Sequence, residues 1–78
     1  MEYGVIKTFG RYAVTIQSSN KQQYYAPFES LDEIILEKLV FPLPQLPVKF
    51  TVNKNKYSGE SRYGKRYYAE DVTLNLEI

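Results

Sequence analysis

Aromatic side chains are crowded into residues 23–28, a short run of β-forming residues that ends in a proline and a phenylalanine. Side chains of a β-strand alternate between two faces, so Tyr24 and Phe28 share one face and Tyr25 lies on the other. One set of rings can pack into a core, which leaves the other set for a different role. Rings on the outside of a small β-domain are typical of platforms that stack nucleobases, although a tyrosine-rich core gives the same pattern.

Basic side chains gather farther along the chain, beside four more tyrosines. Residues 49–66 hold six bases and one acid, whereas residues 29–37 hold four acids and no base. The net charge of +1 therefore conceals a polarised molecule whose positive part can attract polyanions. Two solvated faces of opposite sign are the simpler alternative. The phosphate-binding candidates of this arm are Lys54, Lys56, Arg62, Lys65 and Arg66, and its rings are Tyr57, Tyr63, Tyr67 and Tyr68.

The composition argues against an enzyme. The chain has no cysteine and no histidine, which removes thiol chemistry, the commonest general base and the commonest metal ligand. Glu70 and Asp71 are neighbours in a predicted strand, so they point to opposite faces and make a poor acid–base pair. No glycine-rich phosphate loop and no metal-ligand spacing is found. We expect no catalysis, no cofactor and no metal ion.

The elements that position these groups follow from local patterns. Residues 2–9 are rich in β-forming side chains, and Gly4 indicates a bulge or a close backbone approach. A tight connection at 9–11 leads to a second strand over 12–16. The polar turn 17–22 leads to the third strand, the aromatic run 23–28. In that strand we expect Tyr24 and Ala26 to point inward and Tyr25 to point outward.

A helix is predicted after the third strand. Ser30 and Glu33 fit a capping box in which Ser30 is the N-cap. We expect about two turns, whose apolar stripe covers one end of a sheet. The residues of this stripe are Leu31, Ile34, Ile35 and Leu39.

The second half of the chain predicts a loop and two strands. Three prolines within 42–47 favour an extended loop, with Leu43 and Leu46 directed to the core. Residues 48–53 alternate as a fourth strand that continues in charged form toward residue 57, with Val48, Phe50 and Val52 inward. A turn is expected at 58–61 and a second kink at 63–65. The fifth strand covers 67–74 and extends through 76.

Three strands, a short helix and two strands are the order of an oligonucleotide-binding (OB) barrel. We therefore predict an all-β, closed five-stranded OB fold with one short helix between strands three and four. A chain of 78 residues has room for one core, so we expect a single domain over 1–78. Neither a leader pattern nor an apolar run of about 20 residues is found, and we expect a soluble, cytoplasmic protein that does not span a membrane.

Five segments share their order and pattern with one known family. Residues 4–9 (GVIKTF) lie where the family has its opening strand G-x-V-K-W-F, and residues 12–16 (YAVTI) lie near its motif G-F-G-F-I. Residues 24–31 (YYAPFESL) lie over V-F-V-H-F-S-x-I. Residues 48–52 (VKFTV) and 69–72 (AEDV) resemble V-x-F-x-V and A-x-N-V of the last two strands. Over nearly its whole length the chain thus resembles a diverged cold-shock domain.

The resemblance implies binding of single-stranded nucleic acid by a surface that has fewer of the family's contact residues. Thr8 stands where the family has a base-stacking tryptophan, and Pro27 stands where it has a histidine. Two of the matching rings, Tyr12 and Phe28, equally suit a core, and Lys7 equally suits a solvated strand position. The residues that match contact positions of the family are Lys7, Tyr12, Tyr25 and Phe28.

The leading hypothesis is a module that binds single-stranded RNA or DNA, with RNA-chaperone-like activity as one form of it. Stacking rings and lysines do not read a 2′-hydroxyl, so the sequence does not separate RNA from DNA. The alternative is a protein-interaction or oligomerisation module, in which the apolar segment from Leu39 to Pro47 contacts a protein partner or a second copy in a homodimer. The predicted nucleic-acid-binding residues are Lys7, Tyr12, Tyr25, Phe28, Lys54, Lys56, Arg62, Tyr63, Lys65 and Arg66.

Overall fold

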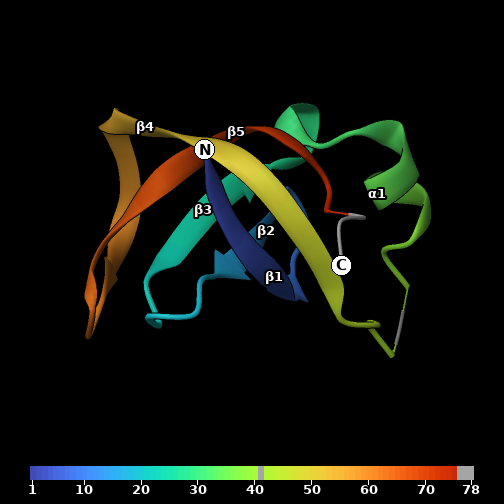
Figure 1. Cartoon of the computed structure of the whole chain (residues 1–78), viewed down its shortest axis with the longest axis horizontal. Helices are drawn as coiled ribbons and strands as arrows, with labels where there is room; N and C mark the ends of the chain where they lie inside the picture. The colour runs from blue at the N-terminus through green and yellow to red at the C-terminus, as the bar shows by residue number, and fades with distance from the viewer. Residues whose placement is uncertain (41, 76–78) are drawn as a thin grey trace.

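Five strands dominate the computed structural model, which describes residues 1–40 and 42–75. A short 3₁₀-helix and one α-helix separate the first three strands from the last two (Figure 1). In chain order the elements are β1 (Glu2–Phe9), β2 (Ala13–Gln17), β3 (Gln23–Pro27), η1 (Phe28–Ser30), α1 (Glu33–Glu37), β4 (Leu46–Ser61) and β5 (Gly64–Leu74).

The strands form a closed barrel in the order β1-β2-β3-β5-β4, which β4 closes by pairing with β1. All neighbours are antiparallel except β3 and β5, which run parallel. The predicted fold class is therefore confirmed: the chain is a small all-β, five-stranded barrel with a short helix between its third and fourth strands. This architecture is compatible with an OB fold.

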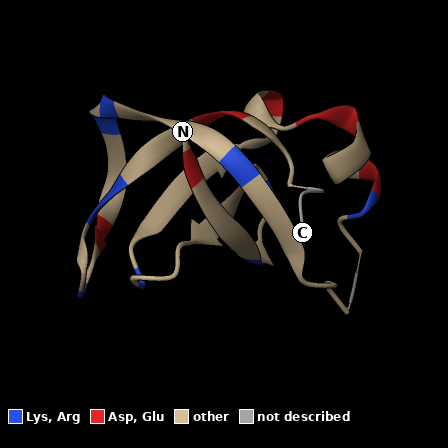
Figure 2. Ribbon diagram, viewed as in Figure 1, with Lys and Arg blue, Asp and Glu red and all other residues tan. Residues whose placement is uncertain are grey.

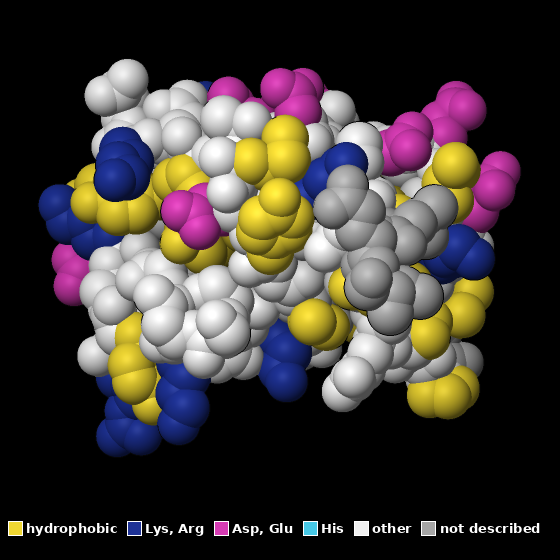
Figure 3. All heavy atoms as spheres, in the orientation of Figure 1, with side chains coloured by type: hydrophobic (Ala, Val, Ile, Leu, Met, Phe, Trp, Pro, Cys, Tyr) yellow, Lys and Arg dark blue, Asp and Glu magenta, His cyan; other side chains and the backbone are white. Residues whose placement is uncertain are grey.

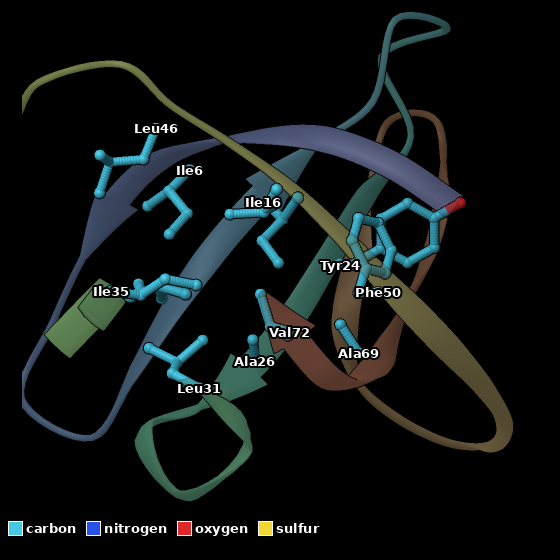
Figure 4. Packing of buried hydrophobic residues seen from close by; sticks show 12 residues of the cluster. Ile6, Ile16, Tyr24, Ala26, Leu31, Ile35, Leu46, Phe50, Ala69 and Val72 are labelled. Carbon is cyan, nitrogen blue, oxygen red and sulfur yellow. The ribbon is translucent and has the colours of Figure 1, made fainter. Parts of the chain in front are cut away.

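The barrel interior is filled by the side chains that alternate inward along each strand. Tyr24 and Ala26 are buried and Val48 and Phe50 are fully enclosed, as the alternation predicts. The Tyr24 and Phe50 ring centroids lie 4.9 Å apart at a tilt of 59° (Figure 4). Burial, and secondarily the Glu2 carboxylate, raises the pKa of the Tyr24 hydroxyl.

Gly4 marks a close approach of β1 to β2, as expected. A Cβ at this position would lie 2.8 Å from both the Gln17 carbonyl oxygen and the Ile16 Cγ2 atom. Any larger side chain would therefore push the two strands apart.

The predicted capping box at Ser30 is wrong. Ser30 ends η1, and α1 begins after Asp32, whose side chain makes no capping hydrogen bond. The cause is a contact distant in sequence: Leu31 bridges to Val72, and the Asp32 amide donates to the Val72 carbonyl oxygen at 3.0 Å. Because this bond holds the backbone extended at residues 31 and 32, a helix can start only after them.

The predicted helical stripe is also only partly correct. Leu31 and Ile35 are buried and Leu39 packs against the core, but Ile34 is 51% exposed. Helix α1 is five residues long, and Ile35 is its one buried residue. The helix therefore covers one end of the barrel with less apolar surface than the sequence pattern predicts.

The proline-rich segment has no regular secondary structure over residues 42–45, with a bend at Pro42, and its leucines face the core as predicted. Leu43 packs against the buried cluster, and Leu46 is buried as the first residue of β4. The strand therefore begins two residues before the predicted boundary. Pro47 has no amide hydrogen to donate, but its carbonyl oxygen accepts from the Asn75 amide at 2.9 Å. Phe41 lies outside the described residues.

The predicted turn at 58–61 is wrong, because β4 continues to Ser61 and turns at residues 62 and 63. The Ser61 hydroxyl accepts from the Tyr63 amide and donates to the Gly64 carbonyl oxygen, both at 3.2 Å, which fixes the turn there. Gly59, with φ +75°, is instead a bulge within the strand. Strand β5 accordingly starts at Gly64 rather than at residue 67. It ends at Leu74, so the predicted extension is wrong at Asn75, and residue 76 lies outside the described residues.

Candidate nucleic-acid interface

The outer face of the barrel carries a pair of tyrosines whose rings are in contact. Tyr25 is paired with Thr15 of β2 and with Tyr68 of β5. Its neighbours Tyr24 and Ala26 point inward, so Tyr25 points outward as predicted. The Tyr25 and Tyr68 ring centroids lie 4.9 Å apart at a tilt of 50°, and the Lys56 ammonium lies 4.8 Å from the Tyr68 centroid. We call this ring pair the tyrosine platform.

An open hollow adjoins the tyrosine platform and shares Tyr25 with it. Tyr12 forms part of its wall and is 72% exposed, because β2 begins one residue after it. The Phe28 amide donates to the Tyr12 carbonyl oxygen at 3.0 Å, which holds the two ring-bearing residues side by side. The hollow, called the ring hollow below, is lined by Tyr12, Tyr25, Pro27, Phe28 and Glu29.

Beyond the barrel, β4 and β5 continue as a two-stranded ribbon over residues 53–68, at the left of Figure 1. The register jumps there, since Asn53 pairs with Tyr68 and Tyr57 pairs with Tyr67. The extra residues between Asn53 and Tyr57 bulge outward, and the Asn53 side-chain oxygen accepts from the Asn55 amide at 2.9 Å. This bulge presents Lys54 and Lys56 to solvent.

The other face of the ribbon carries a second set of rings. Tyr57 and Tyr67 meet edge to face, with centroids 6.4 Å apart, and the Lys65 ammonium lies 4.6 Å from the Tyr57 centroid. Tyr67 is half-buried and packs against the barrel core, whereas Tyr57 is exposed. Of this second set, Tyr57 is therefore the ring open to solvent, whereas Tyr67 belongs to the inner face of the barrel.

Contacts with neighbouring segments hold the ribbon in place. The Gln22 side-chain amide, from the β2–β3 loop, donates to the Lys65 carbonyl oxygen at 2.8 Å. Across the ribbon, the Arg66 Nε donates to the Ser58 carbonyl oxygen at 2.9 Å, and the guanidinium covers Gly59. The basic groups are thus mounted on a braced hairpin.

Charges of opposite sign lie at opposite parts of the molecule. The ribbon carries five of the ten Lys and Arg, on the left in Figure 2, together with one acid, Glu60. Most of the other Asp and Glu lie along the top of the view and on α1 at the right. In the space-filling view, dark blue side chains gather mainly at the left and magenta ones mainly at the top and right (Figure 3). Such a distribution presents a positive field beside the tyrosine platform.

The structure brings most of the predicted residues into two neighbouring groups. Tyr12, Tyr25 and Phe28 line the ring hollow, although Phe28 also packs against the core. Lys7 is exposed but lines a different hollow, with residues of β1 and of the end of β2. The predicted ribbon residues are Lys54, Lys56, Arg62, Tyr63, Lys65 and Arg66.

Sequence reasoning missed Tyr68 as a platform residue. The signal was present, because Ala69 is the kind of small apolar residue that points inward, which places its neighbour Tyr68 outward. Lys21 was also missed, and its ammonium lies 6.0 Å from the Tyr63 ring centroid. That contact joins the β2–β3 loop to the tip of the ribbon, and no local pattern predicts it.

Comparison with known proteins identifies no relative. The chain matches no family model, and neither curated proteins nor solved structures are significantly similar to it. Within residues 1–40 and 42–75, no group of three or more acidic side chains is arranged to hold a metal ion. In the same ranges, no helix is long and apolar enough to cross a membrane.

Proposed function

We propose that the protein binds single-stranded RNA or DNA, stacking bases on the tyrosine platform and in the ring hollow. The observation that carries the proposal is the outward pair Tyr25–Tyr68, with the Lys56 ammonium 4.8 Å from the Tyr68 centroid. A cross-strand ring pair also stabilises a sheet, but here a Lys ammonium lies beside the outward rings, where it can contact the phosphate of a stacked nucleotide. We also propose that the protein is a diverged cold-shock-like domain, that it acts in an RNA-chaperone-like role, and that it is located in the cytoplasm.

Stacking supplies the sequence-tolerant part of the affinity. A base stacked on an aromatic side chain contributes about 1–3 kcal/mol, and every base has a face to stack. Three ring positions, at Tyr12, Tyr25 and Tyr68, lie along one path over the outer face of β3 and β5.

The ribbon supplies the phosphate contacts. Its exposed cations flank the platform on one side, while the acids of α1 lie far from the ribbon in Figure 2. A polyanion is therefore attracted to the ribbon and repelled by the helix, which orients the strand along the platform. Such contacts make binding strongly dependent on salt.

Fluorescence anisotropy with a labelled heptanucleotide tests the proposal. We expect micromolar affinity for a single strand at low salt, and weaker binding of a duplex, whose paired bases cannot stack on rings. Each phosphate neutralised contributes about −0.7 to the slope of log K against log salt concentration. Absence of binding to any single strand at tens of micromolar protein contradicts the proposal.

A second candidate function is protein interaction, and exposed apolar side chains around α1 favour it. Ile34 is 51% exposed and Val40 is 55% exposed, within an acidic part of the surface. A stable dimer in light scattering whose mass does not change when an oligonucleotide is added supports this candidate over nucleic-acid binding.

A further inference from the structure

The ring hollow contains one residue that stacking and phosphate binding do not use. Four of its five lining residues are Tyr12, Tyr25, Pro27 and Phe28, which offer rings, and the fifth is Glu29. Glu29 is exposed in the first turn of η1. No hydrogen bond or ion pair to its carboxylate is found within the described residues. The carboxylate is therefore available to a ligand.

The sign of this charge decides which part of a nucleotide faces it. A phosphate is repelled by Glu29 and attracted to the ribbon, where the Lys56 ammonium lies over Tyr68 of the platform. Tyr25 belongs to both the platform and the hollow, so a strand can stack along it with its phosphates toward the ribbon. A base in the hollow then directs its edge, not its backbone, to Glu29.

A carboxylate is an acceptor only, so it selects base edges by their donors. Guanine presents N1–H and the N2 amine side by side, a pair of donors that matches the two carboxylate oxygens. Cytosine and adenine each present one amine next to a ring-nitrogen acceptor. Uracil and thymine present a single N3–H between two carbonyl oxygens, which repel a carboxylate.

We propose that the ring hollow is a nucleobase pocket in which Glu29 selects guanine through its N1–H and N2 amine. The inference rests on the proposed function and adds a base preference at one position of the strand. The remaining bases stack on the tyrosine platform without such selection, since the platform carries a cation and no carboxylate. The ligand class is a short single strand with one unpaired guanine.

Five labelled heptanucleotides test the preference: seven uridines, and the same strand with guanosine, inosine, cytidine or adenosine at the centre. Inosine keeps N1–H and lacks the N2 amine. We expect the guanosine strand to bind about tenfold more tightly than the all-uridine strand, as for a good bidentate contact to a base. Inosine falls between the two, because it retains one of the two donors.

The variant Glu29→Gln separates base selection from simple repulsion. Its amide keeps one acceptor and gains a donor, so the preference for guanosine over uridine falls close to onefold. Glu33→Gln is the matched control, because it removes the same charge from the first turn of α1, outside the hollow. We expect Glu33→Gln to keep the guanosine preference.

The outcomes distinguish the inference from the proposed function. Equal binding of all five strands overturns the inference and leaves the function standing, whereas no binding of any strand overturns both. If Glu29→Gln strengthens binding of every strand equally and the guanosine preference persists, Glu29 only repels phosphate and the inference fails. Loss of the preference in Glu29→Gln, with the preference kept in Glu33→Gln, supports it.

Discussion

Two adjacent tyrosine pairs on β3 and β5 have opposite environments. Tyr24 and Tyr67 are paired in register and point to the barrel interior, whereas Tyr25 and Tyr68, the next pair, point outward. The inner pair packs against Phe50 and the rest of the core. The outer pair packs mainly against itself and Lys56. The same residue type thus serves the fold on one face and is left for a ligand on the other.

Truncating an inward tyrosine should have the greatest effect of the substitutions considered, which is a loss of fold stability. Tyr24→Ala leaves a cavity against Phe50, and we expect it to lower the free energy of unfolding by about 3 kcal/mol. A domain of this size is only marginally stable, so much of its stability is lost. Urea denaturation measures the change. A loss below about 1 kcal/mol would mean that Tyr24 does not hold the core.

Substitutions on the outer face should weaken nucleic-acid binding and leave the stability of the fold almost unchanged. Tyr25→Ala and Tyr68→Ala each remove a stacking position, and we expect each to weaken single-strand binding by about 1–3 kcal/mol. Each should change the free energy of unfolding by less than about 1 kcal/mol, because both rings are half-buried at the surface. Tyr3→Ala is the control, since Tyr3 is 52% exposed on β1 outside the platform. Equal binding by all three variants removes the distinction between the faces.

Removing a cation from the ribbon should weaken binding less than removing a ring, and the change should be visible in the salt dependence of binding. Lys56→Ala removes a charge beside the platform, so we expect the slope of log K against log salt concentration to become shallower by about 0.7. Lys38→Ala removes the same charge at the C-terminal end of α1, far from the platform, and should leave the slope unchanged. Identical slopes for the two variants would mean that the ribbon does not direct the phosphates.

The smallest effect concerns alkaline pH and again separates the two faces. Burial raises the pKa of Tyr24 above its ordinary value of 10.0, so the folded state favours the neutral hydroxyl. The stabilisation is complete below pH 10 and is lost as the pH rises through the folded-state pKa, because the unfolded chain ionises first. Tyr24→Phe should flatten this alkaline decline in stability, as measured by urea midpoints between pH 9 and about 11. Tyr25→Phe is the control on the outer face.

Alternation along single strands predicted the inner face correctly. Val48 and Phe50 in β4, and Tyr24 and Ala26 in β3, are buried because each strand has one face toward the core. The same reasoning placed Tyr25 outward. These features depend only on residues one and two positions apart, so the sequence contains all that is needed to predict them.

The errors arise where distant segments meet. The hydrogen bond from the Asp32 amide to the Val72 carbonyl oxygen places the start of the helix after Ser30. The sequence around Gly59 is typical of a turn, but it forms a bulge that the Arg66 side chain covers. The ring hollow depends on the bond between Phe28 and Tyr12, which joins two connections of the barrel. No local pattern contains such contacts.

An NMR titration of the tyrosine rings with a single-stranded heptanucleotide tests whether bases stack on the tyrosine platform. Ring stacking shifts the proton resonances of the side chains that contact a base. We expect large shifts for Tyr25 and Tyr68, together with Tyr12, and small ones for Tyr3 on β1 and Tyr24 in the core. Shifts confined to Tyr3, or to the side chains around α1, or no shifts at all, would contradict it.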